Sequence, residues 1–121
     1  MKNVTLPHIH DVPDHMDNIS AELENIDRFE MAADIFKQFS DTTRIRIFWI
    51  LCHTEQCVTN LSALMDMSSP AVSHHLRVLR GCGLIVSRRE GKEVYYRAAD
   101  SARAQLLHTT LEQVMEIACP A

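Results

Sequence analysis

In residues 68–97 the sequence predicts a short helix followed directly by a β-hairpin. Val72, Leu76 and Leu79 recur at the spacing of one buried helical face, and most other positions of this helix are small, polar or basic. A Gly-Cys-Gly sequence then ends the helix, and an apolar strand follows it. The tight turn Glu90-Gly91-Lys92 reverses the chain into a second strand. Any fold for this chain must therefore place a small two-stranded sheet after an amphipathic helix.

Positive charge is concentrated in the same segment. The net charge of the chain is −4, and the first 34 residues hold eight acidic and two basic residues. Residues 68–97 hold six basic residues against only Glu90 and Glu93. Because local charge decides whether phosphate groups are attracted, the acidic total does not exclude a nucleic-acid partner. A helix with a small polar face beside a basic hairpin is the outline of a winged helix-turn-helix, so we expect it to bind DNA.

The whole chain of 121 residues is long enough for one compact domain and too short for two. We expect a mainly α fold with a small β-hairpin wing, an α+β winged helix-turn-helix, in residues 18–119. A flexible polar arm is expected in residues 1–17. No apolar run reaches the roughly 20 residues that a membrane helix needs, and the N-terminus has no apolar signal-peptide core. These features predict a cytoplasmic protein without a membrane partner.

Further helices are predicted before the basic one. Residues 19–39 have the apolar spacing of one or two helices, with Asp27 as the break or cap between them. Asp41 is placed to cap the apolar helix that follows, because its carboxylate can accept hydrogen bonds from free backbone N–H groups. A short helix is expected from Asn60 to Met65, with Thr59 as its cap. It joins the basic helix through a tight turn, which gives the helix-turn-helix unit.

The last helix, expected from Asp100 or Ser101 onward, is apolar on two sides. One stripe consists of Leu107, Leu111, Val114 and Ala118. A small domain covers only one side of such a helix, so the second side predicts contact with a partner subunit.

Several segments match a known pattern in order and spacing. They are FSDTTRIRIF from Phe39, CVTNL from Cys57, SPAVSHHLRVL from Ser69, GLI from Gly83 and RREGKEVYY from Arg88. On these residues, positions 28–118 resemble the ArsR/SmtB family of bacterial metal- and stress-responsive winged-helix repressors. The resemblance implies a homodimer built from the first and last helices, with Leu23 joining the stripe of the last helix in the interface. It also implies repression of a double-stranded operator that an inducer relieves.

The resemblance places the basic helix in the major groove of a palindromic operator and the hairpin on the flanking backbone. Hydroxyl, imidazole and guanidinium groups suit these roles, because they donate hydrogen bonds to bases and phosphates. The residues assigned to DNA are Ser68, Ser69, Ser73, His74, His75, Arg77, Arg88, Arg89 and Lys92. His75 leans toward the core side of its helix, so packing or an internal hydrogen bond is the alternative role for it.

The inducer is less clearly indicated than DNA. One metal site of the family pattern lies across the last helices and takes Asp-x-His followed later by His-x-x-Glu or His-x-x-His. This chain has Asp100 and Glu116 at the outer positions, but Ala102 and Gln113 stand in place of the histidines. Because neither alanine nor glutamine holds zinc well, that site is not expected.

A second family site joins a cysteine before the helix-turn-helix to ligands from the N-terminal arm. Cys57 stands at the cysteine position, and the arm offers His8, His10 and His15. A mixed thiolate and imidazole site would be tetrahedral and would suit zinc or a similar divalent ion as effector. The alternative is that Cys57 is a small buried residue at a helix start and that the histidines belong to a solvated tail.

Other interpretations stay open. A thiol, above all that of Cys57 near a helix N-terminus, can sense oxidation, and an organic ligand is a third class of inducer. His108 and Glu112, four residues apart, are interpreted as an exposed pair on one helix. The histidines do not form a nucleophile and base pattern, so an enzyme is not expected. The last alternative, a protein-interaction module without DNA binding, is disfavoured by the basic hairpin.

Overall fold

The computed structural model of this chain describes residues 6–8 and 15–118. The chain divides into two compact units, residues 1–36 and residues 37–121, which are described separately. The predicted arm falls in the first unit, and its separation from a domain at residues 18–119 stays a prediction. Within the described residues, no helix is both long and apolar enough to cross a membrane.

The first unit contains α1, Met16–Leu23, and most of α2, Ile26–Phe39. α1 ends because the backbone N–H groups of the next two residues donate to carbonyls three residues back, which tightens the last turn. The predicted break or cap at Asp27 is therefore wrong. Asp27 lies inside the first turn of α2, where its negative charge favours the positive end of the helix dipole. Apolar side chains of this unit, including Leu23 and Phe29, are exposed.

In the second unit, α3, Thr42–His53, begins at the predicted cap. The Oδ1 atom of Asp41 accepts a hydrogen bond from the backbone N–H of Arg44 at 2.9 Å, which confirms this cap. Phe48 is fully buried, and the ring of Phe39 meets it edge to face at a centre-to-centre distance of 5.3 Å. α3 also packs against α5 and β3, so it is the helix around which this unit is assembled.

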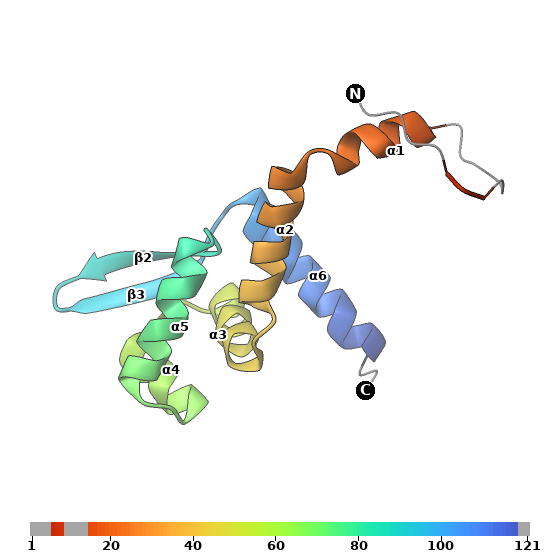
Figure 1. The fold of residues 1–121 in the computed structure, drawn as a ribbon. Coiled ribbons are helices and arrows are strands. Elements are labelled where there is room, and N and C mark those ends of the chain that lie inside the picture. Colours follow the sequence, from red (N-terminus) through yellow and green to blue (C-terminus); the bar gives the residue numbers. More distant parts are fainter. Residues whose placement is uncertain (1–5, 9–14, 119–121) are drawn as a thin grey trace. The chain divides into compact units, whose positions relative to one another are not determined.

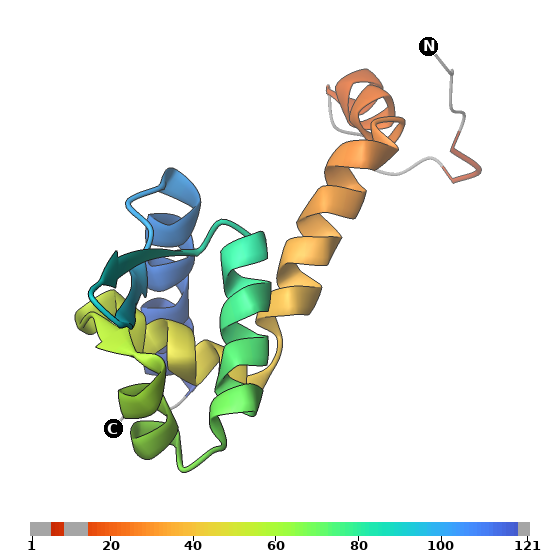
Figure 2. The same cartoon turned by 90° about the vertical axis from the view of Figure 1, so that its left-hand side faces the viewer.

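α4, Val58–Met65, and α5, Ser69–Gly81, form the predicted helix-turn-helix (Figure 2). Asp66 ends α4 with a left-handed φ of 52°, and its backbone N–H bonds to carbonyls in the last turn. Cys57 occupies the N-cap of α4 and Thr59 lies inside the helix, so the prediction of Thr59 as the cap is wrong. The helix starts earlier than expected because Cys57 belongs to a strand whose extended backbone leads directly into it.

The wing is the predicted hairpin of β2, Ile85–Glu90, and β3, Glu93–Ala98, which extends away from α4 and α5 in Figure 1. Gly91 lies in its turn with a φ of 63°, a left-handed conformation that glycine adopts without strain. A third strand, β1, Gln56–Cys57, is not predicted by the sequence. It pairs with β3, so the strand order is β1-β3-β2 and both pairings are antiparallel. This pairing holds the wing against the start of α4.

α6, Ala102–Ala118, is capped by Ser101, whose Oγ accepts a hydrogen bond from the backbone N–H of Ala104 at 3.1 Å. Leu107 and Leu111 are each only 7% exposed. Most of their surface is therefore already covered within the chain, and their predicted place in a subunit interface stays a prediction. The exposed apolar residues of α6 are Leu106, Val114, Met115 and Ile117.

Candidate DNA-binding surface

Hydroxyl groups define the start of α5. The Oγ atom of Ser68 accepts a hydrogen bond from the backbone N–H of Ala71 at 3.3 Å, which caps the helix. The Oγ atom of Ser69 lies 3.1 Å from that of Ser62, and this hydrogen bond ties α4 to α5. Pro70 follows in the first turn, where a missing N–H is tolerated. Ser68 and Ser69, both predicted to contact DNA, are exposed but already hold the helix-turn-helix geometry.

α5 separates an apolar side from a polar side, as predicted. Its buried residues are Val72, Leu76 and Leu79. His74, Arg77 and Arg80 are exposed, and the two arginines line a pocket together with Ser73 and Tyr96 of β3. Neither arginine forms an ion pair with a described residue. The exposed side of α5 therefore presents guanidinium groups next to the wing.

His75, also predicted to contact DNA, has an internal partner. Its Nδ1 atom lies 3.4 Å from Nε of Arg44, 31 residues earlier on α3, and accepts a hydrogen bond from it. Burial lowers the pKa of His75, and the charges of Arg44 and His74 act in the same direction, whereas Asp41 opposes them. The imidazole is therefore neutral near pH 7, which is the form that can accept this bond. An internal hydrogen bond was the alternative role for His75.

Arg44 is the buried charge at the centre of this contact, and its role was missed from the sequence. It is 8% exposed, and its Nη1 atom donates to the backbone carbonyl of Gln38 at 2.6 Å. A buried guanidinium is costly unless its N–H groups are bonded, so these bonds make the burial possible. The sequence spacing does indicate that Arg44 lies on the buried side of α3, because Ile47 and Phe48 follow it by three and four residues on that side.

Replacing Arg44 with methionine should lower the free energy of unfolding by about 2 kcal/mol, the scale of lost hydrogen bonds from a charged group. Methionine keeps much of the buried aliphatic chain. It removes the guanidinium N–H groups that donate to Gln38 and His75. Urea unfolding followed by circular dichroism measures the change. The control is Arg46→Met on the exposed side of α3, which should stay within about 0.5 kcal/mol of the original. Equal urea midpoints for the two variants would show that the buried guanidinium does not contribute to the free energy of unfolding.

Arg88, predicted to contact DNA, is held by acidic neighbours. Its Nε and Nη2 atoms lie 3.0 and 2.6 Å from Oε1 of Glu55, 33 residues earlier, and its Nη1 lies 2.6 Å from Oε2 of Glu90. The guanidinium carbon also lies 4.8 Å from the ring centre of Tyr95. These carboxylates raise the pKa of Arg88, and its hydrogen bonds lower the pKa of Glu55. The positive charge of Arg88 is therefore balanced by these two carboxylates. The contact with Glu55 also ties the wing to the loop before β1.

The two other predicted wing cations are differently placed. Arg89 and Lys92 are exposed, and neither forms an ion pair with a described residue. Side chains alternate across a strand, so Arg89 points to the opposite side of the hairpin from Arg88. Among the described residues, Arg89 and Lys92 are therefore the wing cations without an ion pair, whereas Arg88 is paired with Glu55 and Glu90. Contact of each of the three with DNA stays a prediction.

The predicted metal ligands belong to different units of the chain. Cys57 is 8% exposed, and it is the strand partner of Tyr95 in β3. This burial agrees with the alternative of a small buried residue at a helix start. His8 and His15 belong to the first unit, and His10 lies outside the described residues. A metal site that joins Cys57 to these histidines therefore stays a prediction.

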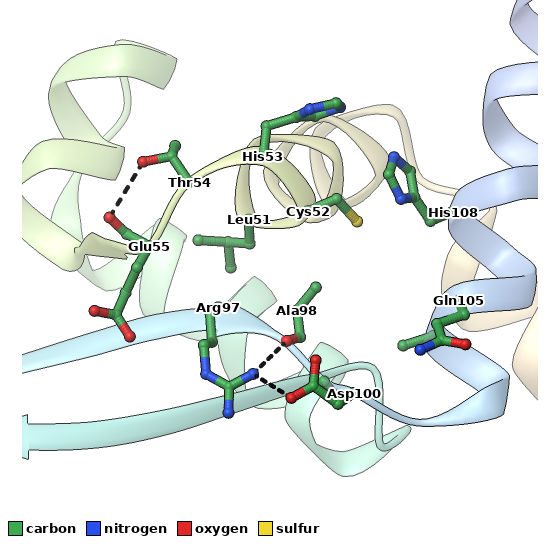
Figure 3. Close-up of a pocket in the computed structure, with 12 residues that line it drawn as sticks. Leu51, Cys52, His53, Thr54, Glu55, Arg97, Ala98, Asp100, Gln105 and His108 are labelled. Atoms are coloured by element: carbon green, nitrogen blue, oxygen red, sulfur yellow. Dashed lines mark hydrogen bonds and ion pairs between the residues drawn. The ribbon is translucent and has the colours of Figure 1, made fainter.

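Thiol chemistry gains no support at Cys52. This residue lies in the last turn of α3 and lines a pocket of about 360 Å³ with His53 and His108 (Figure 3). Burial raises the pKa of the Cys52 thiol to about 11, and the negative charge of Glu112 adds to the effect. Because thiolate is the reactive form, Cys52 is a poor sensor of oxidants near neutral pH. Cys119 lies outside the described residues.

The structure also joins side chains that the sequence did not connect. His108 and Glu112 form the predicted pair on one helix, with Nε2 and Oε1 3.2 Å apart, although His108 is half-buried. His53 of α3, which lies 59 positions before Glu112, joins the same carboxylate. Spacing along one helix contains no information about which helix packs beside it, so no local signal predicts this cluster.

The helix-turn-helix, the cationic side of α5 and the basic wing together define a DNA-binding protein of the winged helix-turn-helix class. Residues 41–87 match the family model described as bacterial regulatory protein, arsR family. A transcriptional repressor SmtB homolog from Synechocystis is 35% identical over 98 residues, which cover 81% of this chain and 74% of that protein. The chain belongs to the ArsR/SmtB family and is a DNA-binding transcriptional regulator.

Further comparisons agree with this family and confirm the predicted fold class. A cadmium resistance transcriptional regulatory protein CadC homolog from Staphylococcus aureus is 37% identical and covers 71% of this chain and 72% of its own length. The structure of reduced HlyU from Vibrio cholerae matches with a TM-score of 0.66 at 27% identity. That match covers 79% of this chain and 97% of the HlyU chain.

Proposed function

We propose that this protein is a homodimeric repressor whose α5 helices enter the major groove of a palindromic operator, and that an inducer releases it. The observation that carries this proposal is the row of exposed cations on α5 and the wing. Arg77 and Arg80 of α5, and Arg89 and Lys92 of the wing, form no ion pair with described residues. In a chain with a net charge of −4, such unpaired local charge favours contact with phosphates.

The residues of α5 divide into two proposed roles. Ser73, His74 and Arg77 reach base edges, because a guanidinium can donate two hydrogen bonds to guanine and the other groups bond more flexibly. Ser68 and Ser69 lie at the start of the helix, next to the phosphate backbone in this docking. His75 supports the helix from inside through Arg44.

The homodimer is proposed from the exposed apolar residues of α6. Leu106 and Ile117 are 65% and 81% exposed, and Val114 lies with them on the uncovered side of the helix. A second copy of the chain would remove this surface from water, which is favourable in proportion to the apolar area covered. Leu23 of α1 is exposed as well, and it stays in the proposed interface together with Ala118, whose side chain lies outside the described residues.

A metal ion is the inducer class that the relatives favour. The Staphylococcus aureus relative is named a cadmium resistance transcriptional regulatory protein homolog. Zinc or a similar divalent ion held by Cys57 with His8, His10 and His15 remains one proposed effector site. Its thiolate and imidazole ligands suit a borderline soft ion.

The proposal is tested by titrating the full chain into DNA from upstream of its own gene, with fluorescence anisotropy as the measurement. Binding should be about 1000-fold or more tighter than to random DNA at one salt concentration. Affinity should fall steeply with salt, because each phosphate contact releases a counterion. Equal affinity for both DNAs, with and without divalent metals, would reject operator recognition. A monomer bound to DNA in light scattering would reject the homodimer.

Arg89→Ala is expected to reduce the slope of log affinity against log salt by about 1 for each wing that loses its phosphate contact. Arg88→Ala should leave this slope nearly unchanged, because Glu55 and Glu90 already neutralise that guanidinium. Anisotropy titrations at several salt concentrations measure both slopes. A larger loss of slope in Arg88→Ala than in Arg89→Ala would contradict this assignment of the wing.

A further inference from the structure

Three hydrogen bonds converge on one carboxylate oxygen of α6. The Oε1 atom of Glu112 lies 3.1 Å from Nε1 of Trp49, 3.3 Å from Nε2 of His53 and 3.2 Å from Nε2 of His108. Potential metal-ligand atoms of the two histidines and Glu112 all lie within 4.8 Å of one another. Two helices that are distant in sequence therefore direct two imidazole nitrogens at the same carboxylate.

This cluster is open to solvent, so stability alone is a weak reason for it. His53 and Glu112 are exposed, and His108 is half-buried, with the two imidazole rings edge to face at 5.2 Å. Exposed ion pairs contribute little, because water solvates the separated charges almost as well. Hydrogen bonds from His53, and then from His108 and Trp49, lower the pKa of Glu112.

We propose that His53, His108 and Glu112 form a zinc-binding site between α3 and α6. Two imidazoles and one carboxylate are a set of protein ligands that zinc takes with water in the fourth position. Zinc bonds to such ligands are about 2.0–2.2 Å long, so small rotations of these side chains suffice to bring the ligand atoms to one ion. Each imidazole binds through Nε2 in its neutral form, with the ring proton on Nδ1.

Trp49 is the positioning residue of this site. Its indole N–H donates to Glu112, and its ring lies 4.4 Å from that of His53, centre to centre. Groups behind the ligands orient them and raise metal affinity. The site does not depend on Asp100 or Glu116, and all three of its ligands come from one chain.

The two helices joined by this site have different tasks in the proposed function, and this part of the inference rests on that function. Figure 3 shows His53 at the end of α3 and His108 on α6, on two sides of the same pocket. α3 packs against α5, and α6 carries the apolar surface proposed for the dimer. Zinc therefore holds the last turn of α3 on the dimer helix, and this restriction reaches α5 through its packing against α3 and releases DNA.

Trp49 is the single tryptophan of the chain and reports directly on the site. Zinc added to the metal-free full chain should change its fluorescence, and competition with a coloured chelator gives the affinity. His53→Gln and His108→Gln should each weaken zinc binding by more than about tenfold and remove the fluorescence change. Gln105→Ala, a change in the same pocket, should bind like the original. Cys57→Ser, which removes the arm site, should keep one zinc ion per chain and the full fluorescence change.

Unchanged zinc affinity and fluorescence in both histidine variants would overturn the site, and so would loss of both in Cys57→Ser. A second measurement, operator binding by anisotropy with and without zinc, tests whether the site also regulates DNA binding. Release of DNA by zinc in Cys57→Ser, but not in His108→Gln, supports the role. Zinc binding at the cluster without any release overturns the role and leaves the site. Absence of operator binding under all conditions overturns the proposed function, while the zinc titration still decides the site.

Discussion

Arg77→Glu is expected to lower operator affinity by about 100-fold or more, because an arginine–base contact contributes about 1–3 kcal/mol and a homodimer loses it in both half-sites. Glutamate also brings a negative charge to a surface that must approach phosphates. The effect should be large because Arg77 is exposed on α5 and no described residue forms an ion pair with it. Anisotropy titration with operator and random DNA at fixed salt measures the loss.

The matched control is Arg46→Glu, which makes the same change of charge at an exposed position of α3. It should lower affinity much less, because charges beyond the Debye length of about 8 Å at physiological salt are largely screened from DNA. Circular dichroism checks that both variants keep the original helix content. Equal affinities for Arg77→Glu and Arg46→Glu would mean that α5 is not the helix that reads DNA.

Phe48→Ala is the substitution expected to destabilise the protein most, by about 3–5 kcal/mol. Phe48 is 0% exposed, and the edge-to-face contact with Phe39 disappears together with the buried area. A small domain is stable by only about 5–15 kcal/mol in total, so a large share of its stability would be lost. Urea unfolding at one fixed protein concentration measures the effect, since dimerisation makes stability depend on concentration.

Leu64→Ala is the control for this experiment, because it also shortens an apolar side chain but at a position that is 57% exposed. It should change the free energy of unfolding by no more than about 0.5 kcal/mol. If Phe48→Ala and Leu64→Ala unfolded at the same urea concentration, α3 would not be the packed centre that its burial indicates.

Much of the DNA-binding surface could be predicted because its signals are local. The i, i+4, i+7 spacing of Val72, Leu76 and Leu79 places them on one face of any helix, whatever packs against it. The glycine in the wing turn and the carboxylate of Asp41 act on backbone groups within a few residues. For the same reason the order of helices and wing was readable before any tertiary contact was known.

Helix boundaries were less predictable, because a cap depends on the backbone of its neighbours. Thr59 has a side chain suited to capping, but the strand pairing of Cys57 with Tyr95 moves the start of α4 before it. Asp27 is likewise suited to a cap, yet α2 has already begun at Ile26. In both cases the backbone conformation of the neighbouring residues, rather than the capping preference of one side chain, decides where the helix begins.

The chemistry of individual charges depended entirely on long-range packing. Local sequence gave no sign that Arg88, predicted to contact DNA, is paired with Glu55, 33 residues away. His75 was predicted to contact DNA, with packing or an internal hydrogen bond as the alternative, and only the tertiary structure places Arg44 beside its ring. Leu107 and Leu111 were predicted in the subunit interface from their stripe, and only the tertiary structure shows that each is 7% exposed within the chain. Sequence spacing gives the residues of one face and cannot say what covers that face.

Residues 68–97 alone identify a winged helix-turn-helix that binds DNA, because periodicity, turn residues and local charge act over a few positions. Only the tertiary structure decides which cations remain available to DNA and which histidines meet. Arg89 is left without an ion pair among the described residues while Arg88 is neutralised. His53 meets Glu112 across 59 positions of sequence. These outcomes follow from the packing of α3 against α6 and of the wing against the loop before β1, which no local pattern specifies.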